Sequence, residues 1–94
     1  MRLVVRGAAE ADIPEVSCWY EARSPGLSYE FPHTVDVALA EITCMPERYP
    51  LARDTVRRAL LRRFPYAVFF VAAPDLLSVL ACMHARRDPR RWQE

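Results

Sequence analysis

The hydrophobic positions of this chain change their spacing about halfway along it. In residues 9–45 they recur every three or four positions, which is typical of amphipathic helices. From residue 55 onward they alternate or form short continuous runs, which indicates strands. A short apolar run at residues 2–6, "RLVVR", predicts one further strand before the helices. The expected order within a single domain, residues 1–94, is therefore strand, helix, helix, strand, strand, strand.

The segment 11–26, "ADIPEVSCWYEARSPG", predicts the first helix, which "SPG" at 24–26 ends. Asp12 and Glu15 have the spacing of a capping box, and Pro14 would then lie in the first turn, where its missing N–H costs little. The apolar face of this helix consists of Ala9, Ile13, Val16 and Tyr20. Trp19 and Tyr20 are expected to pack in the core or against the second helix.

The second helix is predicted over residues 27–47, and its apolar face consists of Phe31, Val35, Leu39, Ile42 and Met45. Pro32 must lie early in it, since a later proline would kink the helix, and Pro46 ends it. "SPG" at 24–26 is a short turn between the two helices, which predicts an antiparallel helical hairpin.

Three strands are predicted at residues 55–61, 64–72 and 76–84. Their connections are so short that they require an antiparallel meander. Phe64, Tyr66, Val68 and Phe70 of the middle strand face one way, and Ala67, Phe69 and Val71 face the other. Because both faces are apolar, this strand is expected to be central and covered on both sides. The helical hairpin would cover one face; the C-terminal tail, a second copy or a partner would cover the other.

These elements predict an α+β fold, a two-layer sandwich in the order β-α-α-β-β-β with the helical hairpin packed on an antiparallel sheet. No apolar run approaches the ~18 residues of a membrane span, and the N-terminus does not resemble a signal peptide, so a cytoplasmic protein is expected. Three scattered cysteines and two histidines give no metal-binding spacing. We expect no metal and no cofactor, and we expect Cys18, Cys44 and Cys82 to be buried thiols. His33 is expected at the surface.

The charge is unevenly divided. Residues 1–47 carry three arginines and eight acidic residues, a net charge of −5. Residues 48–94 carry ten arginines and four acidic residues, a net charge of +6. All thirteen basic residues are arginine, which grips phosphate or carboxylate in a planar fork. The arginine pairs could form one recognition surface. Alternatively, the two halves neutralise each other across the fold, or the arginines are solvated charges that protect sheet edges from aggregation.

Four motifs, "WYEARSPGLSYEF", "PERYP", "VRRALLRRFPYAVFF" and "VLACMHARRDPRRW", together closely resemble the RelE/ParE toxin superfamily, in its ParE-like branch of plasmid stabilisation proteins. The resemblance implies the toxin half of a bacterial type II toxin–antitoxin pair, which forms a hetero-oligomer with a cognate antitoxin. ParE-like members interfere with DNA gyrase, whereas RelE-like members are ribosome-dependent mRNA endonucleases. A third possibility is an inactive module that only binds the antitoxin.

The candidate site residues differ between these functions. For binding of an antitoxin or a target they are Arg57, Arg58, Arg62, Arg63, Tyr66, Arg86 and Arg87. Acidic groups of an antitoxin would pair with Arg57, Arg62 or Arg63. For mRNA cleavage, His84 would act as base or acid, Arg57, Arg63 and Arg86 would clamp the phosphate, and Tyr66 would stack on a base. The chain has no lysine and no tyrosine after His84, which speaks against the nuclease. His84 could also be purely structural.

Overall fold

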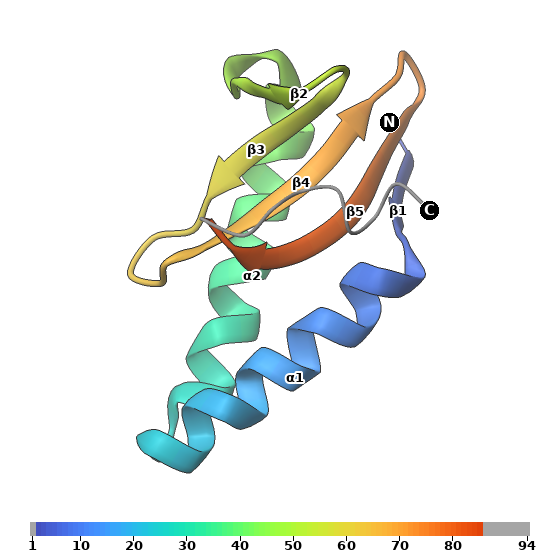
Figure 1. Cartoon of the computed structure of the whole chain (residues 1–94). Helices are drawn as coiled ribbons and strands as arrows, with labels where there is room; N and C mark the ends of the chain where they lie inside the picture. Colours follow the sequence, from blue (N-terminus) through green and yellow to red (C-terminus); the bar gives the residue numbers. More distant parts are fainter. Residues whose placement is uncertain (1, 86–94) are drawn as a thin grey trace.

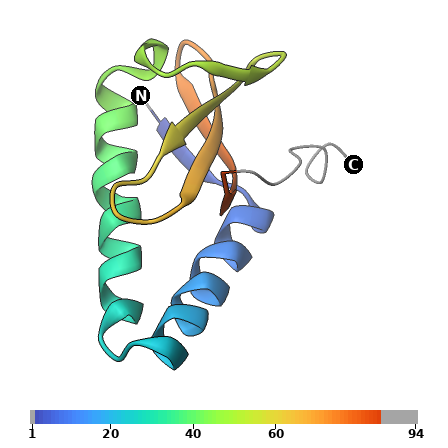
Figure 2. The ribbon, with the colours of Figure 1, turned by 60° about the vertical axis from the view of Figure 1, so that its left-hand side comes forward.

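The computed structural model describes residues 2–85. Its elements, in chain order, are β1 (Arg2–Val5), α1 (Gly7–Arg23), α2 (Leu27–Cys44), the 3-10 turn η1 (Pro46–Arg48), β2 (Leu51–Arg53), β3 (Val56–Leu60), β4 (Tyr66–Ala72) and β5 (Leu76–His84). The five strands form one sheet in the order β1-β5-β4-β3-β2. Both helices lie on the same side of this sheet and form an antiparallel hairpin (Figures 1 and 2). The predicted α+β two-layer fold is confirmed.

The sheet differs from the predicted one in two ways. The meander β3–β4–β5 is antiparallel as expected, but β1 pairs with β5 in parallel, so the sheet is mixed. The pattern also missed β2, which has only three residues, all exposed. Such a short edge strand carries no hydrophobic alternation and is held by pairing with β3, which no local pattern reveals.

The main core lies between the helices and the sheet. It contains Phe31, Val35 and Ile42 of α2 and Val68, Phe70, Leu77 and Val79 of the sheet, all at most 2% exposed. At one end, the rings of Tyr20, Phe31, Phe64 and Tyr66 meet mostly edge-on, with centroid distances of 5.0–6.2 Å. These rings join both helices to the β3–β4 turn, and each such contact adds about 0.5–1.5 kcal/mol beyond area burial.

The opposite face of the sheet carries a second apolar cluster, consisting of Val56, Ala67, Phe69, Ala81 and Met83. Its members are buried, which confirms that the middle strand β4 is apolar on both faces. The helices do not cover this face (Figure 2). The expectation that the C-terminal tail covers it concerns residues 86–94, which lie outside the described residues.

The prediction for the start of α1 was wrong. The helix begins at Gly7, so Pro14 is its eighth residue and Asp12 lies in its interior, where it is buried and is no cap. The backbone N–H of Arg6, the residue before the helix, donates to the Val79 carbonyl of β5. A D-x-x-E spacing occurs inside helices as well as at their ends, so it could not by itself locate the boundary.

Several individual predictions can be compared with the described residues. Ile13, Val16 and Tyr20 pack against the core as expected, and His33 is exposed. Met45 is 56% exposed because α2 ends at Cys44, before it. Trp19 is 47% exposed and makes an edge contact with Tyr20, with the ring centroids 5.0 Å apart. Cys82 is buried, but Cys18 and Cys44 are exposed, which corrects the expectation for these two thiols.

Candidate functional site: the arginine turn and the groove beside α1

Arg57 and Arg58 lie on opposite faces of β3. Arg57 pairs in register with Phe70, whose side chain faces the helices, and Arg58 pairs with Phe69 of the second cluster. The Arg57 guanidinium donates from Nη1 to the carbonyls of Tyr49 at 2.6 Å and Glu47 at 3.5 Å. Arg57 therefore fastens the segment between α2 and β2 to the sheet, and its guanidinium is engaged within the fold.

Arg62 and Arg63 lie in the β3–β4 turn, beside α2. The Arg62 guanidinium forms an ion pair with Glu41 at 3.3 Å, and that of Arg63 forms one with Glu30 at 3.6 Å. Both arginine side chains remain at least 70% exposed, so these pairs are solvent-screened and contribute little to stability. The pairs join the acidic first half of the chain to the basic second half, in line with partial neutralisation across the fold.

The backbone at Arg63 is unusual. Its φ angle is 72°, in the left-handed region that glycine or asparagine normally occupies. An arginine in this conformation costs about 1 kcal/mol relative to glycine. The turn therefore holds an exposed guanidinium at a position where the backbone favours a different residue.

The described arginines of the candidate set do not form one patch. Arg62 and Arg63 share the β3–β4 turn, Arg57 is engaged by backbone carbonyls, and Arg58 lies on the other face of the sheet. This agrees with the prediction that only some of the four could share a surface. The candidates Arg86 and Arg87 lie outside the described residues.

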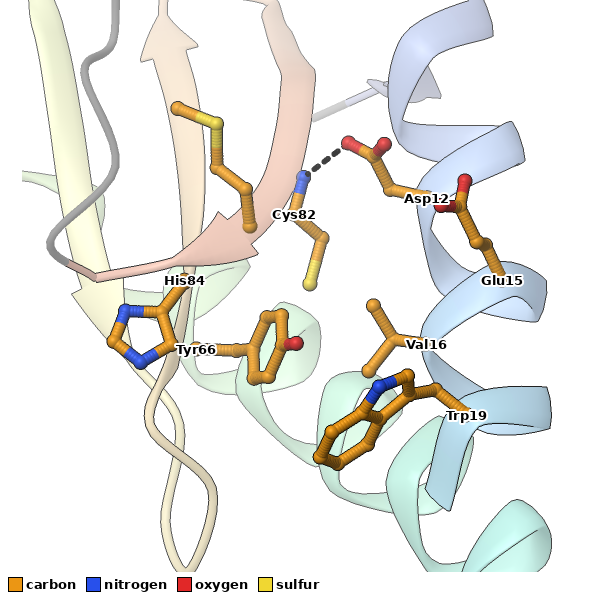
Figure 3. A pocket seen from close by; sticks show the side chains of 8 residues that line it. Asp12, Glu15, Val16, Trp19, Tyr66, Cys82 and His84 are labelled. Carbon is orange, nitrogen blue, oxygen red and sulfur yellow. Dashed lines mark hydrogen bonds between the residues drawn. The ribbon is translucent and has the colours of Figure 1, made fainter. Parts of the chain in front are cut away.

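Tyr66 and His84 come together at the end of the sheet. They are register partners on β4 and β5, and their rings meet edge-on with a centroid distance of 5.6 Å. Both line a groove of about 460 Å³ that opens between these strands and α1. Figure 3 shows Asp12, Glu15, Val16 and Trp19 of α1 facing them across this groove. Cys82 and Met83 complete its lining among the described residues.

Asp12 connects α1 to the edge of β5 that β1 leaves unpaired. Because β1 ends at Val5, no strand within residues 2–85 pairs with β5 beyond Val79 on that side. There the Asp12 carboxylate accepts a hydrogen bond from the backbone N–H of Cys82, at 3.1 Å. Burial, and secondarily the negative charge of Asp12, raises the pKa of the Cys82 thiol to about 12. Cys82 therefore stays protonated at neutral pH and is not a nucleophile.

The groove does not contain the arrangement expected for a nuclease. The described residues that line it include His84 and Tyr66 together with two carboxylates, but neither Arg57 nor Arg63. The carboxylates of Asp12 and Glu15, which line the same groove as His84, repel a phosphate, whereas RNA cleavage requires cations around it. Within residues 2–85, no three histidine, cysteine or acidic side chains are arranged to hold a metal ion.

Sequence reasoning did not assign Asp12, Glu15 and Trp19 to a site. With Val16, they follow the spacing i, i+3, i+4, i+7, which puts all four on one stripe of a helix. A stripe that mixes two acids with two apolar residues is the signal in the sequence that points to this groove.

Comparison with known proteins adds one finding. No family model and no curated protein matches the chain, but ten chains of solved structures do. One belongs to a structure described as "Chromosomal ParDE TA system from P. aeruginosa", with a TM-score of 0.79. The match covers 89% of this chain and 95% of that chain at 17% sequence identity. The chain therefore shares its fold with that chain. At this identity the likeness concerns the fold alone.

No helix in residues 2–85 is long and apolar enough to cross a bilayer.

Proposed function

We propose that this chain is the toxin component of a bacterial type II toxin–antitoxin system, ParE-like in action, which inhibits DNA gyrase in the cytoplasm and is neutralised by a cognate antitoxin. The observation that carries the proposal is the fold likeness to a ParDE-system chain, which extends over nearly the full length of both chains. The four sequence motifs of ParE-like character support it independently.

The proposed antitoxin surface lies along α2 and the neighbouring sheet edge. Val37 is 40% exposed and Leu60 is 61% exposed, and both line a shallow groove that also includes Arg62. An apolar strip with an arginine at its border suits an amphipathic segment whose carboxylates lie to one side of its apolar face. Arg62 and Arg63 would exchange their screened partners Glu41 and Glu30 for carboxylates of the antitoxin. Such pairs contribute specificity and association rate more than affinity.

Replacement of the two turn arginines tests this surface. The Arg62→Ala/Arg63→Ala double variant should bind the purified antitoxin at least tenfold more weakly in calorimetric titration, because two interfacial charge pairs are lost. Arg2→Ala is the matched control, since Arg2 is an exposed arginine on β1, at the other edge of the sheet. Equal affinities for all three proteins would rule out the arginine turn as the antitoxin contact.

Messenger RNA cleavage is the second candidate, and the observation that favours it is the contact between His84 and Tyr66 at the groove. Asp12 and Glu15 line the same groove, and their carboxylates disfavour binding of a phosphate. We therefore place mRNA cleavage below gyrase inhibition.

One experiment separates the three functions. The chain is induced without its antitoxin, and the purified protein is assayed for inhibition of gyrase supercoiling and for cleavage of ribosome-bound mRNA. Inhibited supercoiling with intact mRNA supports the proposal, and codon-phased cleavage supports the nuclease. Normal growth with neither activity would leave an inactive antitoxin-binding module.

A further inference from the structure

The side chains that line the groove beside α1 have no role in the proposed inhibition of gyrase. Three aromatic or heteroaromatic rings, those of Trp19, Tyr66 and His84, line it together with the carboxylates of Asp12 and Glu15. No arginine is among its described lining residues. Trp19 lies at its border with almost half of its surface exposed, which is uncommon for so large an apolar side chain.

The Trp19 ring already stacks with a cation on one face. The Arg23 guanidinium lies 3.7 Å from the ring centroid and is held there by a hydrogen bond from Nη1 to the Trp19 carbonyl, at 3.2 Å. Aromatic faces attract guanidinium groups through the ring quadrupole and stacking. This contact within the fold shows that the indole suits such a partner.

We propose that the groove binds the guanidinium of an arginine side chain presented by a partner protein. Glu15 supplies an exposed carboxylate, while Asp12, positioned by the Cys82 N–H, adds negative potential from the buried side. The flat guanidinium can pair with a carboxylate and stack on an aromatic ring at the same time, which an ammonium group does less well. The volume of about 460 Å³ accommodates one such side chain with its stem against Val16 and Tyr66.

This assignment does not depend on the toxin function, because it rests only on the shape and charge of the groove. The charge of the groove is negative, whereas the turn that carries Arg62 and Arg63 is positive and is expected to bind acidic groups of a partner. A partner that engaged both regions would need a carboxylate at one contact and an arginine at the other. The two contacts can be tested separately, since neither region shares a residue with the other.

The test uses the full-length chain in a Trp92→Phe background, which leaves Trp19 as its one tryptophan. The probe is an acetylated, amidated Gly-Arg-Gly peptide, and the comparison peptide carries citrulline, which is neutral and nearly isosteric. We expect a saturable change in Trp19 fluorescence with the arginine peptide, with a dissociation constant on the order of 1 mM. The citrulline peptide should bind at least tenfold more weakly.

Two variants locate the binding. Glu15→Gln should weaken binding of the arginine peptide by about threefold or more, since it removes a groove carboxylate without changing the shape of the side chain. Glu10→Gln is the matched control, an exposed glutamate on the same helix that does not line the groove, and it should bind like the parent. Circular dichroism verifies that both variants are folded.

Three results would overturn the proposal. Equal binding of the citrulline peptide would indicate an apolar site without charge recognition. Equal weakening by Glu10→Gln and Glu15→Gln would indicate a diffuse charge effect. A response that appears only after Arg86 and Arg87 are replaced by alanine would assign the groove to the chain's own segment 86–94, not to a partner.

Discussion

The two helices of the hairpin pack on the same sheet in different ways. α2 buries Phe31, Val35 and Ile42, large apolar side chains that are at most 2% exposed. The buried residues of α1 are Ala9, Asp12 and Ser17, of which two are polar. Ile13, Val16 and Tyr20 of α1 pack against the same core but are only partly buried. α2 therefore provides the large, fully buried apolar side chains of the hairpin, whereas α1 combines partly buried apolar contacts with buried polar groups and borders the groove.

The reason lies in the side chains that each helix offers to the sheet. Ser17 bonds to the Ile13 carbonyl of its own helix and Asp12 bonds to the β5 backbone, so these polar groups of α1 are satisfied within the fold. Figure 3 shows that Asp12, at one end of the stripe, reaches the β5 backbone, while Val16 and Trp19 face Tyr66 and His84 across the groove.

The largest expected effect concerns α2. Phe31→Ala should lower the free energy of unfolding by about 3–5 kcal/mol, because it removes a fully buried ring that touches Tyr20, Phe64 and Tyr66. Trp19→Ala on α1 should cost about 1 kcal/mol or less. Urea unfolding followed by circular dichroism measures both values, and comparable losses would break the distinction between the helices.

Asp12 should be the most sensitive polar position of α1. Asp12→Ala leaves the buried Cys82 N–H without its acceptor, which should cost about 1–3 kcal/mol in the same unfolding assay. Asp12→Asn keeps an acceptor oxygen and should cost clearly less. If the two variants are equally stable, the hydrogen bond does not hold α1 to β5.

The Cys82 thiol predicts a dependence on alkaline pH. Its pKa is raised to about 12 in the folded protein, above a value of 9.0 for the exposed group, so between these pH values the unfolded chain loses a proton that the folded chain keeps. Stability should therefore fall as pH rises above 9, with a slope from this group of up to about 1.4 kcal/mol per pH unit. Cys82→Ala should show a shallower slope from pH 8 to pH 10.5, and an identical slope would contradict the burial of a protonated thiol.

The ion pairs of α2 should have the smallest effect. Arg62→Ala should change stability by about 1 kcal/mol or less, because its pair with Glu41 is exposed. Arg63→Gly should be neutral or slightly stabilising, since glycine relieves the left-handed backbone while the screened pair with Glu30 is lost. A loss above 2 kcal/mol in either variant would mean that α2 depends on its polar contacts as α1 does.

Several features could be predicted from the sequence alone because they depend on local periodicity. The helical spacing of Phe31, Val35 and Ile42 and the two apolar faces of residues 64–72 appear in the structure where they were expected. The short connections led to the antiparallel meander, because two or three residues cannot cross a sheet. The opposite faces of Arg57 and Arg58 followed from the two-residue period of a strand.

Tertiary contacts decided the rest. The three-residue edge strand β2 pairs with its sequence neighbour β3, and no hydrophobic alternation marks it. The parallel pairing of β1 with β5 joins residues far apart in the chain, as does the hydrogen bond from Arg6 to Val79 just before α1. The groove arose in the same way, since Asp12 meets Cys82 across a separation of 70 residues. A periodic pattern specifies which side chains share a face, but it contains no information about what that face meets. For this reason the sequence determined the elements and their inward faces, and only the folded chain determined where carboxylates, aromatic rings and arginines come together.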